Sequence, residues 1–262
     1  MVKYVNPSFE ILTPIDRVKV LSLIELAGRT CYKSEDLITS ESAAKFVKMI
    51  TGRDHLSVIE HYVVTVKFII PRGVSHEMVR HRLASYSQES TRYCNYGKAK
   101  FGGEITVIDQ RPIICKHYCV ELFYGFAPKF GKAILICDDG TVKSMLPEDK
   151  TGIDEKTIIA VEKCRNRVER WMRHMEACER EYLDAINDGV APNNFPPEIA
   201  RGNLPIDLKT EIVMTANLRE WQYIFSKRCA PAAHPNMRQV MIPLREEFRK
   251  VLPEIFGEVG SP

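Results

Sequence analysis

Residues 62–71 read YVVTVKFIIP, a run in which β-branched and aromatic side chains dominate before a proline. Such side chains fit the pleated surface of a sheet, and a proline cannot donate a ladder hydrogen bond. We therefore predict a strand over residues 62–70 that ends at Pro71. Further strands are predicted at 9–13, 105–108 and 208–215.

Helical patterns lie on both sides of this strand. Asp16 is expected to cap a helix that ends near Tyr32, and a second helix is expected from 40 to about 51. A turn is predicted at 55–61, and a helix from 73 to about 84. The helices predicted further along are 157–187, a short one that starts at Pro196-Pro197 and carries Arg201, 217–227, and 234–256 with an interruption near Pro243.

The predicted helix at 157–187 is amphipathic, because its apolar residues recur at helical spacing. Those near one face are Ile158, Val161, Val168, Trp171, Met175, Cys178, Tyr182 and Ile186. Gly189 and the proline-rich loop at 192–197 are expected to end this helix. Residues 98–153 have the least regular pattern, with an apolar run at 133–137 and a turn at 138–140, and we expect an insertion there. No repeat or linker divides the chain, so the sequence predicts one α+β domain over residues 1–262.

The composition is that of a folded soluble protein, with 262 residues, 45% hydrophobic and 27% charged. Lys and Arg total 37 against 34 Asp and Glu, which does not indicate a surface for long nucleic acids. The eight cysteines are expected to be reduced in a cytoplasmic protein, because the chain is large and starts without a signal-peptide pattern. No apolar run approaches the roughly 20 residues that span a bilayer.

Residues 80–93, RHRLASYSQESTRY, hold three arginines, one histidine and three serines. A guanidinium can bind a phosphate with two hydrogen bonds, and serine hydroxyls can complete such a site. This segment therefore predicts a phosphate site at a helix end and in the loop 86–97. If residues 80–82 are helical, Arg80 and Arg82 project to nearly opposite sides. They would then serve two ligands, or one ligand shared with a neighbouring subunit.

Other chemistries fit the sequence less well. His76 and His81 are five residues apart, one too many for a zinc-protease helix, and the cysteines 115 and 119 lack a paired second cluster, so no metal site is expected. Neither a dinucleotide fingerprint nor a Walker loop is present. Two rival functions stay open: a nucleotide or RNA-binding module that stacks bases on Tyr86, Tyr93 and Tyr96, and a thiol- or metal-dependent hydrolase.

Residues 80–92 resemble the signature of the flavin-dependent thymidylate synthases: RHR, two residues, Ser, one residue, Asn, two residues, Ser, one residue, Arg. Ser87 stands where that signature has asparagine. The resemblance continues in family order at 55–61, 200–201, 217–219 and 227–228, and it covers most of the chain outside 98–153.

This resemblance implies a mixed or antiparallel sheet flanked by long helices, in a homotetramer that holds FAD between subunits. It also implies transfer of a one-carbon unit from 5,10-methylenetetrahydrofolate to dUMP, with NADPH reducing the flavin. Residues 98–153 would be variable within the family. Nucleic acids and membranes are not expected as partners.

Site residues follow from the resemblance, position by position. Arg228 is expected to be catalytic, because its cation would lie beside the uracil ring. Residues expected to bind dUMP are Glu77, Arg80, Gln88, Glu89, Ser90, Thr91, Arg92, Arg201 and Arg228. Residues expected to contact FAD are Ser57, Arg80, His81, Arg82, Gln88, Asn217, Arg219 and Tyr223.

Overall fold

The structure is a computed structural model, and it describes residues 2–124, 133–136, 142–144, 154–187 and 195–257. The chain divides into two compact units. One comprises Met1–Val5 with Ser90–Leu208, and the other comprises Asn6–Glu89 with Lys209–Pro262. Below, the first is called the long-helix unit and the second the sheet unit.

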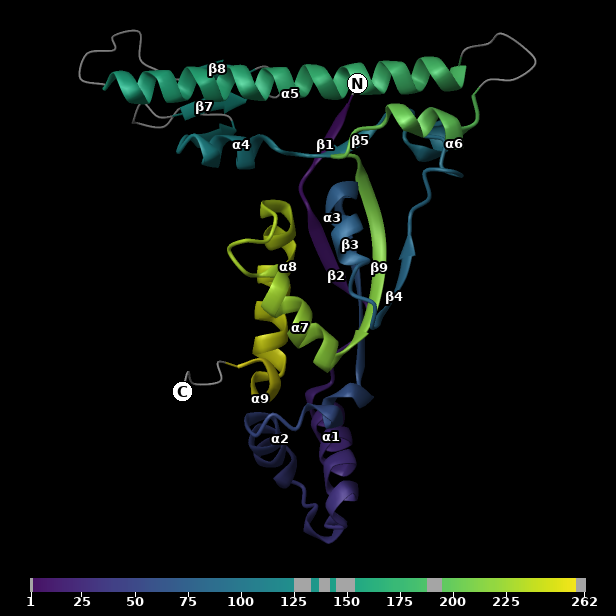
Figure 1. Ribbon diagram of the computed structural model, residues 1–262, viewed down its shortest axis with the longest axis vertical. Helices are drawn as coiled ribbons and strands as arrows, with labels where there is room; N and C mark the ends of the chain where they lie inside the picture. Colours follow the sequence, from purple (N-terminus) through teal and green to yellow (C-terminus); the bar gives the residue numbers. More distant parts are fainter. Residues whose placement is uncertain (1, 125–132, 137–141, 145–153, 188–194, 258–262) are drawn as a thin grey trace. The chain divides into compact units, whose positions relative to one another are not determined.

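The sheet unit is built on four antiparallel strands in the order β2-β3-β9-β4 (Figure 1). Their bounds are Ser8–Ile11 for β2, Val63–Pro71 for β3, Lys209–Asn217 for β9 and Ala84–Gln88 for β4. Alternate residues of β3, from Val64 to Ile70, are fully buried, as are alternate residues of β9. The predicted strands at 9–13, 62–70 and 208–215 are confirmed.

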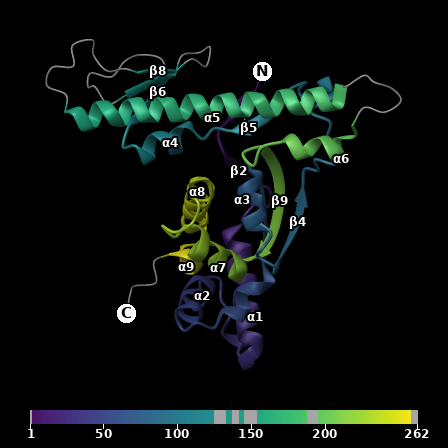
Figure 2. The same cartoon turned by 45° about the horizontal axis from the view of Figure 1, so that its top comes forward.

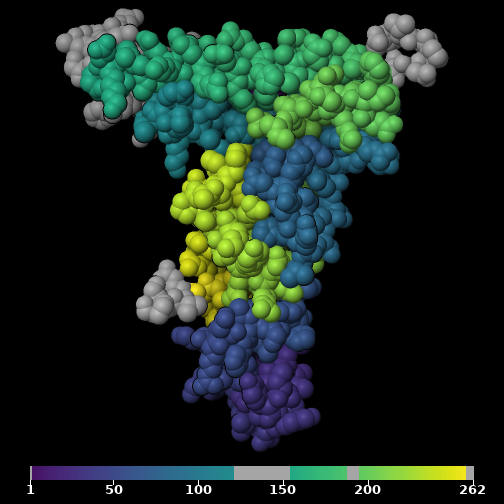
Figure 3. All heavy atoms as spheres, viewed as in Figure 1, coloured from purple at the N-terminus to yellow at the C-terminus, as the bar shows by residue number. Residues whose placement is uncertain are grey.

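The helices of this unit share one hydrophobic core with the sheet, and that core includes an aromatic cluster. Their bounds are Arg17–Tyr32 for α1, Ser42–Gly52 for α2, Leu218–Arg228 for α7, Pro235–Val251 for α8 and Pro253–Phe256 for α9, with short 3-10 helices at Glu35–Leu37 and Leu56–His61. Trp221 of α7 lies 5.5 Å from Phe248 of α8 between ring centroids. Figure 3 shows the atoms of α7 and α8 in direct contact.

The predicted helix starts in this unit are confirmed. The Asp16 side chain accepts hydrogen bonds from the backbone N–H groups of Val18 and Lys19, and so caps α1. The predicted break near Pro243 is wrong, because α8 continues through Pro243 to Val251. The helix ends instead at Val251, because the next residue, Leu252, precedes Pro253, whose ring disfavours a helical conformation in the residue in front of it.

The predicted helix from 73 to 84 is also wrong in its second half. The helix α3 covers only Arg72–Met78, and β4 begins at Ala84. Carbonyls at the end of α3 are bonded from outside the helix: Arg228 donates to Glu77 O at 2.8 Å, and Tyr86 Oη lies 2.7 Å from Met78 O. The tertiary contacts therefore end the helix before the RHR segment.

The long-helix unit is organised around α5, which spans Glu155–Asn187 (Figure 2). The predicted helix at 157–187 is confirmed, and most of its predicted apolar face is buried. A parallel pair, β1 (Lys3–Val5) with β5 (Thr106–Ile108), belongs to this unit, and β5 confirms the strand predicted at 105–108. The other elements are η3 (Ala99–Phe101), α4 (Arg111–His117), α6 (Pro197–Ala200), η4 (Arg201–Asn203) and a sheet of β6 (Glu121–Tyr124), β7 (Ala133–Ile136) and β8 (Val142–Ser144).

The α+β fold class and the antiparallel sheet are confirmed. The predicted turn at 138–140 and the expected break at Gly189 lie outside the described residues. That residues 98–153 form an insertion stays a prediction. No helix in the described part of the chain has both the length and the apolar character needed to cross a bilayer.

Candidate active site

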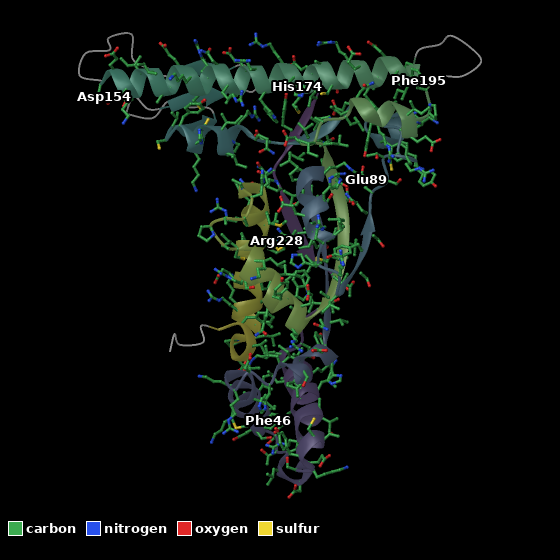
Figure 4. The ribbon with its side chains drawn as sticks, viewed as in Figure 1. Phe46, Glu89, Asp154, His174, Phe195 and Arg228 are labelled. Atoms are coloured by element: carbon green, nitrogen blue, oxygen red, sulfur yellow. The ribbon has the colours of Figure 1, made fainter. Side chains whose placement is uncertain are left out.

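Arg228, the last residue of α7, is the centre of a polar cluster in the sheet unit (Figure 4). Its Nε donates to Nε2 of His81 at 2.9 Å, and its two terminal nitrogens donate to Glu77 Oε2 at 2.9 Å and Glu77 O at 2.8 Å. Arg228 is thus brought together with two predicted site residues, Glu77 and His81, that lie about 150 positions earlier in the chain. Because the guanidinium is planar, these bonds fix its orientation.

His81 is the buried member of this cluster, with a side chain 6% exposed. Arginine Nε always carries its proton, so Nε2 of His81 must be the acceptor and the ring proton must sit on Nδ1. That nitrogen lies 3.3 Å from Glu220 Oε1. Burial, and next the charge of Arg228, lower the pKa of His81 to about 4. The imidazole is therefore neutral at pH 7, and burial also raises the pKa of Glu220.

This low pKa predicts acid sensitivity. Between the ordinary pKa of about 6.5 and the folded-state pKa of about 4, the unfolded chain binds a proton at His81 that the folded chain does not. His81 should thus cost on the order of 3 kcal/mol of unfolding free energy as the pH falls through this window. The variant His81→Gln keeps an acceptor for Arg228 but does not titrate. We therefore expect its unfolding free energy to fall less between pH 6.5 and pH 4 than that of the wild type.

Denaturant unfolding between pH 4 and 7 measures this effect. His76→Gln is the matched control, because His76 is an exposed histidine of α3. The control should keep the wild-type slope. An unchanged slope in His81→Gln would show that His81 is not the group responsible.

Arg80 and Arg82 lie in the turns between α3 and β4, not on a helix. The condition under which they would project from opposite sides of a helix is therefore not met. Tyr86, in the following strand β4, donates from its hydroxyl to His81 O at 2.8 Å. This hydrogen bond holds the turn in place. Both arginines are exposed, and neither has an ion-pair partner among the described residues. Their charges are available to an anionic ligand.

Ser57 and Arg219, two predicted FAD contacts, line one pocket of the sheet unit with a volume of about 430 Å³. Other lining residues are Gly28, Cys31, Tyr32, Ile50, Asp54, His55, Leu56 and Val58. Arg219 also pairs with Glu60 at 2.5 Å. Asn217 instead caps α7, since its side chain accepts from the backbone N–H of Glu220 at 2.9 Å. Its side-chain amide Nδ2 is not used by this cap and can still donate to a ligand.

Tyr223 lies beside His81, with ring centroids 5.8 Å apart in an edge-to-face arrangement, and is 52% exposed. Gln88 and Glu89 stand at the end of β4 and hold the sheet together. Gln88 Nε2 donates to Ser75 Oγ at 2.7 Å, and Glu89 accepts from Lys209 Nζ at 3.0 Å. These two residues thus have structural partners in the sheet unit (Figure 4 labels Glu89).

The remaining predicted dUMP contacts belong to the long-helix unit. Arg92 donates to Glu198 of α6 at 3.2 Å, and Ser90 Oγ accepts from the backbone N–H of Arg92 at 3.3 Å. Thr91 is buried, whereas Arg201 is exposed at the start of η4 and has no ion-pair partner among the described residues. The signature at 80–92 is thus divided between the two units.

Sequence reasoning missed Glu220, Tyr86 and Glu198. Asn217 followed three residues later by Glu220 is typical of a helix cap. This pattern assigns Glu220 to the helix start, so it gives no indication that the carboxylate faces His81. Tyr86 was interpreted as a loop aromatic, although its hydroxyl holds the turn before β4. Glu198 has no signal in the sequence, because its pairing with Arg92 joins segments that are far apart in the chain.

Residues 15–254 match the family described as "Thymidylate synthase complementing protein". A flavin-dependent thymidylate synthase of Geobacter sulfurreducens is 29% identical over 244 residues, which cover 90% of this chain and 81% of that relative. One of Pyrococcus furiosus is 27% identical over 238 residues, covering 90% and 75%. Among solved structures, thymidylate synthase X from Helicobacter pylori, determined with FAD and dUMP, has a similar fold, with a TM-score of 0.58 and 17% identity over 95% of this chain and 99% of that one.

This chain therefore belongs to the thymidylate synthase complementing protein family. The resemblance drawn from residues 80–92 is confirmed, as is the prediction of an enzyme. The roles of the individual site residues stay predictions.

Proposed function

We propose that this chain is a flavin-dependent thymidylate synthase that converts dUMP to dTMP. The one-carbon unit comes from 5,10-methylenetetrahydrofolate, which leaves as tetrahydrofolate, and NADPH provides the reducing equivalents. The family match and the names of the relatives support this activity. The structural observation that carries the proposal is the guanidinium of Arg228, held in place by His81 and Glu77.

Arg228 is suited to stabilise negative charge on a pyrimidine ring. A guanidinium has five N–H donors, and three of them are used by His81 and Glu77. Two remain, one on each terminal nitrogen, and they can donate to a ring oxygen as charge develops there. Since the group is already oriented, little reorganisation is needed at that moment. This assistance raises the nucleophilicity of C5 of the uracil, so no protein nucleophile is needed.

The nucleotide phosphate requires cations that are not already neutralised. In the described part of the chain, Arg201 has no carboxylate partner, and Arg92 shares only an exposed one, Glu198. An exposed ion pair of this kind is worth about 0–1 kcal/mol, so a phosphate can displace it. We assign the phosphate to Arg92 and Arg201, with Ser90 as a further donor.

The sheet unit also has residues that fit FAD. Ser57 and Arg219 line its 430 Å³ pocket, and Arg80 and Arg82, which have no ion-pair partner within the described ranges, offer guanidinium groups for a diphosphate. The neutral ring of His81 adds a polar neighbour. When bound, FAD supplies the redox chemistry that takes a hydride from NADPH to the pyrimidine. The protein residues bind and orient the ligands and stabilise the negative charge that develops on them.

The exposure of Arg80 and Arg82 is compatible with flavin held between subunits of a homotetramer, which we propose as the assembly. A cytoplasmic location follows from the proposed substrates, which are intracellular metabolites. A nucleotide or RNA-binding module without flavin is the alternative that the next experiment distinguishes.

Arg82→Ala should weaken FAD binding by at least tenfold and leave dUMP binding within about threefold, because one charge-assisted hydrogen bond is worth about 1.5–3 kcal/mol. Equilibrium titrations of each ligand measure this difference. Lys48→Ala removes an exposed cation of α2 and serves as the control for net charge. A selective loss of dUMP affinity would overturn the assignment, and absence of FAD binding by the wild type would favour the alternative.

A further inference from the structure

A cationic pocket lies in the long-helix unit, between α4 and α5, and no residue predicted to bind dUMP or FAD lines it. Its volume is about 570 Å³, which is within the range of small-ligand sites. The lining residues are Ile113, Ile114, His117, Tyr118, Lys163, Asn166, Arg167 and Arg170. Figures 1 and 2 both show α4 running along α5.

The cations of this pocket come from one face of α5. Lys163, Arg167 and Arg170 are four and three residues apart, so they project within about 60° of one another and extend over roughly 10 Å of the helix axis. No carboxylate lines the pocket, and none of the three has an ion-pair partner among the described residues. Three like charges on one helix face repel one another. An anion bound among them would relieve that repulsion.

An adjoining pocket of about 430 Å³ shares Ile114, Arg167 and Arg170 with the first. It adds Gln110, Trp171, His174 and Asp207, and Figure 4 labels His174 on α5. Asp207 is its one carboxylate and accepts from Trp171 Nε1 at 2.9 Å. The two pockets together form a continuous cationic surface, which we call the α4–α5 trough.

Gln110 provides an independent sign of a ligand. Its side chain is only 8% exposed, and its Nε2 has no hydrogen-bond partner among the described residues. A buried donor without an acceptor costs about 1–3 kcal/mol. Gln110 also lines the adjoining pocket, so an acceptor oxygen of an occupant would satisfy this buried donor if the Gln110 side chain turned toward the pocket.

We propose that the α4–α5 trough binds a small ligand with a linear chain of phosphates. One phosphate would engage one cation, whereas two or three linked phosphates match a row of cations roughly 10 Å long. Phosphate oxygens also supply the acceptor that Gln110 lacks. Half-buried Tyr118 and Trp171 offer aromatic surface next to the cations, which suits the base of a nucleoside triphosphate.

The test is calorimetric titration of the full chain with tripolyphosphate, ATP and adenosine, in the presence of saturating dUMP and FAD. Tripolyphosphate and ATP should both bind, and adenosine alone should not. If ATP binds at least tenfold more tightly than tripolyphosphate, the natural ligand is a nucleotide, whereas equal affinity indicates that the phosphates alone are recognised. Absence of binding by both phosphate compounds would overturn the proposal.

Two double variants with the same change in charge locate the site. Arg167→Gln with Arg170→Gln should weaken tripolyphosphate binding at least tenfold. Arg173→Gln with Arg180→Gln, which removes two exposed arginines of α5 outside both pockets, should change it less than twofold. Equal losses in the two variants would show diffuse attraction to a basic helix and would refute the site.

Gln110→Leu separates ligand binding from folding. Because Nε2 makes no hydrogen bond within the described protein, this substitution should leave the Tm within about 2 °C of wild type and weaken tripolyphosphate binding severalfold. An unchanged affinity would remove Gln110 from the site.

Discussion

Arg228→Ala is expected to lower the kcat for dTMP formation by about 100- to 1000-fold, the range for loss of a donor to a developing anion. The substitution removes the two N–H donors that are free for substrate. Flavin binding should persist, because Glu77 and His81 are held by their own elements and Glu77 is 40% exposed. The measurements are the steady-state rate and the absorbance spectrum of added FAD.

Two further variants sharpen this test. Arg228→Lys keeps the positive charge but lacks the planar fork, so its rate should lie between those of Arg228→Ala and the wild type. Lys227→Ala removes a neighbouring exposed cation and should retain at least a third of the wild-type rate. If Arg228→Ala turned over at a wild-type rate, Arg228 would have no part in the chemistry.

Trp221→Ala is expected to destabilise the protein by about 3–5 kcal/mol, the range for truncating a large buried aromatic side chain. Trp221 is fully buried, stacks on Phe225 at 5.6 Å, and donates from Nε1 to Val64 O at 3.2 Å. It therefore holds α7, and with it Arg228, against β3. The truncation would lose this hydrogen bond as well as leaving a cavity.

Denaturant unfolding of Trp221→Ala and Tyr223→Ala gives the matched comparison. Tyr223 lies on the same helix but is 52% exposed, so its truncation should cost no more than about 1 kcal/mol. Similar losses in the two variants would mean that Trp221 does not anchor α7.

Patterns of apolar residues predicted several elements of both units well. The β3 strand, the capped α1 and the long α5 all have one buried face, and burial imposes the period that a sequence displays. The strand β4 could not be recognised in this way. Its residues 84–88 alternate between half-buried and exposed, but most are polar, and the pairing with β9 depends on segments distant in the chain.

The same limit applies to the site. The family resemblance selected Arg228, His81 and Glu77, which the structure brings into hydrogen-bonding contact. The sequence could not predict that His81 is neutral, because its pKa is lowered by burial in the folded chain. Nor could it predict that Glu220 lies beside His81, because that contact forms only on folding. Nor could spacing show that Gln88 is committed to Ser75.

The most direct test of the proposed activity is dTMP formation by the purified protein with dUMP, 5,10-methylenetetrahydrofolate, NADPH and FAD, compared with reactions that omit one component at a time. We predict dTMP in the complete mixture and none above background when dUMP, the folate, NADPH or FAD is omitted from flavin-free protein. Product formation that is independent of flavin, or no product in the complete mixture from protein that binds FAD and dUMP, would contradict the proposal.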